Sequence, residues 1–98
     1  MTPKQVIDDE IKRFSDVMNV STDQKEDLIH FLRDNYAQLL NFMRRNPGVS
    51  RNDLFQRLDI IRSAGQAELA EFLSPEQLTI WDSEMAKASK VLSQKLAA

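Results

Sequence analysis

The sequence contains no cysteine, which excludes disulfide bonds, zinc–thiolate sites and a thiol nucleophile. Glycine occurs only at positions 48 and 65, and proline only at positions 3, 47 and 75. No alternating run indicates a β-strand, and no apolar run approaches the roughly 18 residues needed to cross a bilayer. These absences favour an all-α chain that lacks a glycine-rich phosphate-binding loop.

The size and charge of the chain set further bounds. Its 98 residues with 42% hydrophobic content fit one domain, residues 1–98, with a modest core. The 13 basic and 15 acidic residues give a formal net charge of -2, and the two signs are interspersed along the sequence. Bulk charge therefore favours neither nucleic acid nor a membrane surface as a partner.

One helix-start signal recurs along the chain. The stretches MTPKQ at position 1, VSTDQ at position 20 and LSPEQ at position 73 share an apolar residue, a Ser or Thr, and a Gln three residues later; VSRND at position 49 is a weaker copy. This is the capping-box pattern, in which the hydroxyl and the Gln side chain satisfy free amides of the first helical turn. We predict helices over 3–18, 22–45, 51–72 and 75–96, with a turn at Asn46–Pro47–Gly48, in an elongated hairpin-like or bundle arrangement.

The second predicted helix carries more apolar residues than one buried stripe needs. Phe31 and Phe42 widen its apolar stripe toward a second face, and three arginines surround the turn that follows. A thin helical layer cannot hide both faces, so we predict an exposed or shared apolar surface, whereas a compact four-helix monomer would bury the same side chains. The predicted client- or partner-binding residues are Phe31, Phe42, Met43, Arg44, Arg45, Arg51 and Phe55.

No residue pattern indicates an enzyme or a cofactor site. Asp23, Glu26, Asp27 and His30 share one helical face, but acidic residues also favour the first turn of a helix through its dipole. A single histidine without a second histidine or a cysteine is a poor transition-metal site. We therefore predict no catalytic residue, no metal site and no cofactor.

The stretches VSTDQKEDL and FLSPEQLTIW resemble the paired motif of the periplasmic LTxxQ-motif family, which includes spheroplast-protein-Y chaperones and the accessory repressor of the Cpx envelope-stress system. The likeness covers residues 20 to about 96, with Ser in place of Thr in both motifs. The matching positions are Val20, Ser21, Gln24, Leu73, Ser74 and Gln77.

The resemblance implies a thin, elongated, all-helical protein that pairs as an antiparallel homodimer. It also implies an ATP-independent periplasmic chaperone or stress-response protein that binds unfolded clients or a sensor domain. The chain would then be a mature form, and a cytoplasmic location would follow if Met1 is the natural start.

Two other functions compete with this interpretation. Arg44, Arg45 and Arg51 around the turn also fit the opening of a helix-turn-helix DNA-binding domain, although Glu68 and Glu71 on the following helix would face the duplex. The other alternative is a compact helical adaptor of unknown partner.

Overall fold

A computed structural model describes residues 2–97. Over these residues the chain is all-α, as predicted, with four α-helices and no strand. The elements are α1 (Pro3–Val17), α2 (Thr22–Arg45), α3 (Arg51–Glu68), a short 3₁₀ turn η1 (Leu69–Glu71) and α4 (Pro75–Leu96).

Each α-helix begins at a hydroxyl side chain. Thr2, Ser21, Ser50 and Ser74 are the N-caps, and each accepts a hydrogen bond from the backbone amide three residues later. Reciprocal capping boxes with Gln form at α1, α2 and α4, whereas Asp53 of α3 makes no bond back to its cap. Glutamine therefore closes the box where aspartate, with its shorter side chain, does not.

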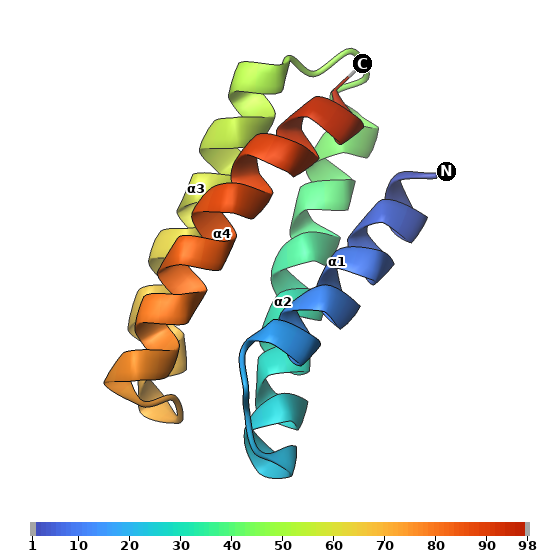
Figure 1. The fold of residues 1–98 in the computed structure, drawn as a ribbon. Coiled ribbons are helices and arrows are strands. Elements are labelled where there is room, and N and C mark those ends of the chain that lie inside the picture. Colours follow the sequence, from blue (N-terminus) through green and yellow to red (C-terminus); the bar gives the residue numbers. More distant parts are fainter. Residues whose placement is uncertain (1, 98) are drawn as a thin grey trace.

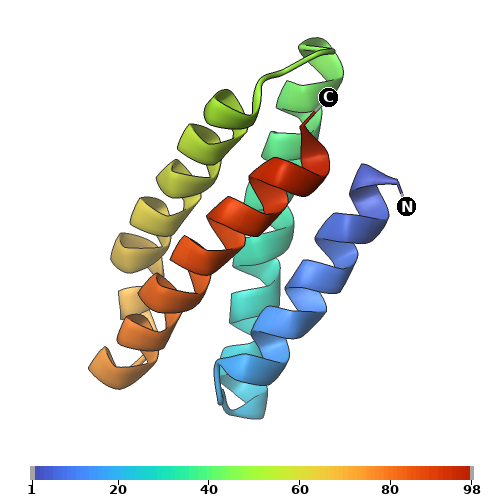
Figure 2. The same cartoon turned by 45° about the horizontal axis from the view of Figure 1, so that its top comes forward.

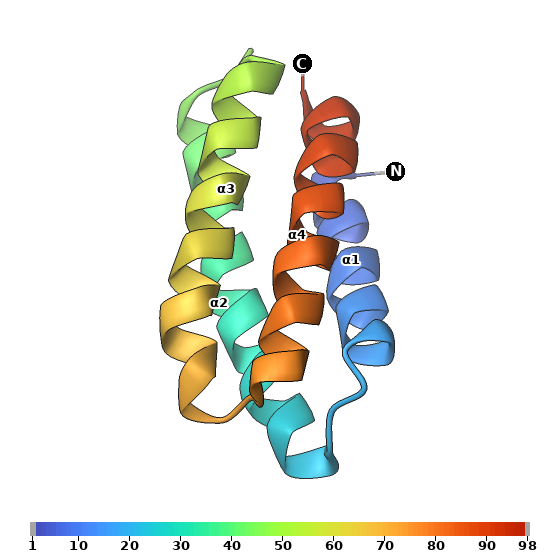
Figure 3. The same ribbon diagram turned by 60° about the vertical axis from the view of Figure 1, so that its left-hand side comes forward.

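The helices run alternately up and down and form two hairpins (Figure 1). The α1–α2 hairpin and the α3–α4 hairpin pack together, with α1 beside α4 and α2 beside α3 (Figures 2 and 3). The α1–α2 and α3–α4 connections lie at one end of the bundle, and the longer α2–α3 connection lies at the other. Gly48, with φ of +82°, supplies the left-handed residue of that longer connection.

The core is one apolar cluster to which all four α-helices contribute. Its centre is Trp81, whose ring lies 5.2 Å from Phe14 and 5.7 Å from Phe31, measured between ring centroids. The indole nitrogen donates to the Arg62 carbonyl, and the ring lies directly over Gly65. A side chain at position 65 would collide with the indole, so this glycine allows α3 and α4 to approach closely.

The bundle is more compact than a thin helical layer. Its extents are 38 × 20 × 18 Å and its radius of gyration is 13.0 Å, close to the ~13 Å expected for a globular chain of about 100 residues. The third helix also ends earlier than predicted, because the chain tightens into η1 before Phe72. That tightening fits the extended Ser74 cap and Pro75, which disfavour continued helix at this point.

Candidate functional site

The two glutamines of the paired motif meet in space. The Gln24 Nε2 atom donates to Gln77 Oε1 at 3.1 Å, and Gln77 Nε2 donates back to Gln24 Oε1 at 3.0 Å. Each Nε2 also donates to a carbonyl of the opposite hairpin, Gln24 to Phe72 and Gln77 to Asn19. Residues 53 positions apart in sequence therefore join the two hairpin connections.

These glutamines also complete the caps of α2 and α4. The Oε1 atoms accept from the amides of Ser21 and Ser74, so each Oε1 takes a second hydrogen bond from the opposite glutamine. The apolar motif residues Val20 and Leu73 pack against the core just before the caps. The motif residues thus hold the two hairpins together at one end, which is a structural role.

The opposite end of the bundle carries several arginines and partly exposed apolar side chains. Arg44, Arg45 and Arg51 are exposed beside the α2–α3 connection, and the Phe55 side chain keeps 37% of its surface exposed. Helix dipoles favour the cations at the end of α2 but oppose Arg51, which is the first residue of α3. We call this end of the bundle the arginine end, and the residues that belong to it are Phe42, Met43, Arg44, Arg45, Arg51, Phe55 and Arg57.

Sequence reasoning missed Arg57. Its guanidinium carbon lies 3.8 Å from the centroid of the Phe42 ring, a cation–π contact between α3 and α2. Residues 42 and 57 are brought together only by the antiparallel packing of these helices, so no local pattern indicates the pair. Phe42 and Met43 are half-buried, and Met43 packs against the core.

Phe31 differs from the rest of its predicted set. It is only 9% exposed and packs edge-on against Trp81, so it belongs to the core of the bundle. This placement differs from the prediction that Phe31 lies on an exposed or shared surface. The second hairpin covers the face of α2 that a thin layer would have left open.

The arginines of the arginine end differ from two others that are engaged in ion pairs. Arg13 pairs with Glu10 and Glu84, and Arg62 pairs with Asp59 and Asp82. Hydrogen bonds to these carboxylates raise the pKa of both guanidinium groups above the ordinary value. The bond to Glu10 has the largest effect on Arg13, and the bond to Asp59 has the largest effect on Arg62. Within residues 2–97, by contrast, no carboxylate pairs with the four guanidinium groups of the arginine end.

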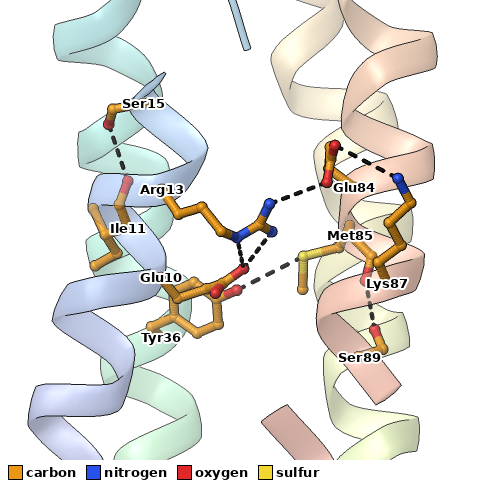
Figure 4. Close-up of polar contacts among 9 residues, drawn as sticks. All are labelled: Glu10, Ile11, Arg13, Ser15, Tyr36, Glu84, Met85, Lys87 and Ser89. Carbon is orange, nitrogen blue, oxygen red and sulfur yellow. Dashed lines mark hydrogen bonds and ion pairs between the residues drawn. The ribbon is translucent and has the colours of Figure 1, made fainter. Parts of the chain in front are cut away.

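Arg13 belongs to a polar layer between the hairpins (Figure 4). Its side chain reaches from α1 to Glu84 on α4, while the buried Tyr36 hydroxyl of α2 lies 3.7 Å from the Met85 sulfur. Burial raises the pKa of Tyr36 well above its ordinary value. The layer therefore joins α1, α2 and α4.

An acidic pocket lies between α2 and α3, toward the end opposite the arginines. This cavity of about 540 Å³ is lined by Phe31 and Phe72, and its carboxylates come from α2, from the last residue of α3 and from η1. His30 lies 3.4 Å from Asp34 and pairs with it only when the imidazole is protonated. The acidic side chains of this pocket are Asp27, Asp34, Glu68 and Glu71.

Residues 2–97 contain no group of three or more His, Asp or Glu side chains placed to hold a metal ion. In that same range, no helix combines the length and the hydropathy needed to cross a bilayer. Comparisons with family models, with curated proteins and with solved structures gave no match.

Proposed function

We propose that the protein is an ATP-independent binding protein of the bacterial periplasm that captures unfolded clients, or a sensor domain, at its arginine end. The observation that carries this proposal is that four guanidinium groups without a carboxylate partner in residues 2–97 lie at the same end of the bundle as the partly exposed Phe42, Met43 and Phe55, with Arg57 stacked on Phe42. Apolar contact supplies most of the affinity of such a surface, and the positive charge raises the rate at which acidic segments are captured.

The glutamine pair adds support through the resemblance to the LTxxQ-motif family. Gln24 and Gln77, which carry the resemblance, are bonded to each other and to the opposite hairpin connections. The shared motif thus has a structural reason to occur twice in one chain. Export to the periplasm belongs to the same proposal, and a signal sequence encoded directly upstream of Thr2 would test it.

The experiment measures aggregation of an unfolding client protein without ATP. Wild type should slow aggregation, and the triple variant Arg44→Gln/Arg45→Gln/Arg51→Gln should protect much less at equal helical content. A matched control removes three exposed cations from the outer face of α1 and α2, in Lys12→Gln/Lys25→Gln/Arg33→Gln. Equal loss of protection in both triple variants would show that the arginine end is not the client-binding site. No protection by wild type would leave the alternative of a helical adaptor of unknown partner.

The DNA-binding alternative has less support. A helix-turn-helix unit sets its two helices at about 90–120°, whereas α2 and α3 lie side by side and antiparallel (Figure 3). The exposed Glu68 at the far end of α3 and Glu71 of η1 would also repel a duplex that followed this helix. Binding of duplex DNA that falls steeply with salt and requires Arg51 would reverse this preference.

A further inference from the structure

The face formed by α2 and α3 has opposite charges at its two ends. Arg57 of the arginine end stacks on Phe42 and lines the groove together with Gln38, Ile60 and Ile61. The acidic pocket occupies the other end of the same groove. Arg45 lies seven residues, about two turns, beyond Gln38 and so continues the same stripe of α2.

The two helices repeat one spacing of charge. Eleven residues separate Asp34 from Arg45 on α2, and eleven separate Arg57 from Glu68 on α3. Eleven residues make about three turns, or roughly 16 Å, so each pair lies on one side of its helix. The α2 and α3 helices are antiparallel (Figure 1). Their sequence positions therefore put both arginines toward one end of the face and both carboxylates toward the other.

We propose that this α2/α3 face associates with the same face of a second copy, about a two-fold axis that crosses the helices. Such an axis lays α2 and α3 antiparallel on their counterparts. Arg45 then lies opposite Asp34 of the partner subunit, and Arg57 lies opposite Glu68 of the partner subunit. The association also covers Ile60, which is 64% exposed in the single chain and lies between the two charged ends.

A second copy is the occupant that this charge pattern favours. A surface of one sign, such as nucleic acid or an anionic membrane, would be attracted at one end of the face and repelled at the other. A self-contact under the two-fold axis matches opposite charges at both ends, as closed dimers of identical chains require of their interfaces. The exposed apolar residue between the charges is then removed from water.

The self-contact would also regulate client binding. This regulation rests on the proposed function, whereas the interface itself does not depend on that function. Arg45 and Arg57 belong both to the arginine end and to the self-contact. An acidic client and a second copy therefore compete for the same guanidinium groups. Dissociation of the dimer should free the arginine end for clients.

Charge reversal tests the interface by light scattering and analytical ultracentrifugation. Arg45→Glu/Arg57→Glu and Asp34→Lys/Glu68→Lys should each raise the dimer dissociation constant by at least about tenfold, because each places like charges together. Mixing the two variants should give a heterodimer, and the quadruple variant should restore the homodimer. The matched controls are Lys12→Glu/Lys90→Glu and Asp9→Lys/Asp16→Lys. They change exposed charges on α1 and α4, which do not form this face, and should leave dimerisation unchanged.

The outcomes separate the interface from the proposed client site. A monomeric wild type, dimers that survive either reversal, or a mixture that stays monomeric would each overturn the interface, with circular dichroism confirming that every variant is folded. If the interface is right, Asp34→Lys/Glu68→Lys should be monomeric and keep or increase client protection per chain. Loss of protection in that variant would overturn the competition, while absence of protection in every variant would overturn only the proposed function.

Discussion

The contact between Gln24 and Gln77 should be measurable as a coupling energy. Each single substitution by Ala removes a capping-box bond, the reciprocal amide pair and one bond to a carbonyl of the other hairpin. A cap contributes about 1 kcal/mol and a net hydrogen bond roughly 0.5–1.5 kcal/mol. Because the pair is only partly buried, we expect each single variant to lose about 2 kcal/mol and the pair to couple by about 1 kcal/mol.

Gln5 provides a matched control for this measurement. It closes the same kind of capping box at the start of α1, with Oε1 accepting from the Thr2 amide at 2.8 Å, but none of its hydrogen bonds within residues 2–97 reaches another helix. Gln5→Ala therefore reports the cap alone, and the excess loss in Gln77→Ala reports the contact between hairpins. The free energies of unfolding come from denaturant titrations of the two single variants and the double variant.

Two results would refute this account of the motif. If the losses in Gln24→Ala and Gln77→Ala add to within about 0.3 kcal/mol in the double variant, the glutamines do not interact in solution. If Gln77→Ala is no worse than Gln5→Ala, the contact between hairpins adds no stability. We also expect Ser74→Ala to lower stability without reducing client protection by the folded protein; lost protection at unchanged stability would make the motif itself a binding site.

Two further predictions concern the core. Gly65→Ala should destabilise the protein by about 1–3 kcal/mol, because its Cβ would lie within 2.5 Å of the Trp81 indole nitrogen, although Ala is the better helix former. The control Ser63→Ala, at an exposed position of the same helix, should instead gain slightly in stability. Equal gains in the melting temperature of both variants would contradict the close approach of α3 and α4. Burial raises the pKa of Tyr36, so its contribution to stability is present below its ordinary pKa of about 10 and is lost as pH rises above it. Tyr36→Phe should flatten that alkaline decline, and parallel stability curves for both proteins would show that the hydroxyl is not buried in solution.

Local sequence signals predicted most of the secondary structure. The three Gln-containing boxes and the weaker signal at Ser50 mark the observed helix starts, because a cap depends on residues within one turn of each other. The Asn46–Pro47–Gly48 turn also follows from local chemistry, with Gly48 in the left-handed region. The end of the third helix was less predictable, because no strong stop signal precedes η1.

The candidate site was only partly predictable. Arg44, Arg45 and Arg51 are neighbours in sequence around one turn, so their proximity in space follows from the chain itself. Arg57 joins them through its contact with Phe42, which depends on how α3 packs against α2. The acidic pocket likewise combines side chains from residues 27–38 of α2 with Glu68 of α3 and with Glu71 and Phe72 beyond it, and no local pattern indicates that combination.

The sequence by itself determined that this chain forms four capped helices with apolar faces, since caps, turns and helical periodicity act over one or two turns. Only the tertiary structure decided that the two hairpins close around Trp81 and bury Phe31, because either a thin layer or a bundle can satisfy the same apolar stripes. Tertiary packing also brought Gln24 to Gln77 and gave the α2/α3 face its opposite charged ends. These contacts join residues far apart in sequence, and their energies depend on a distance that exists only once the helices have packed.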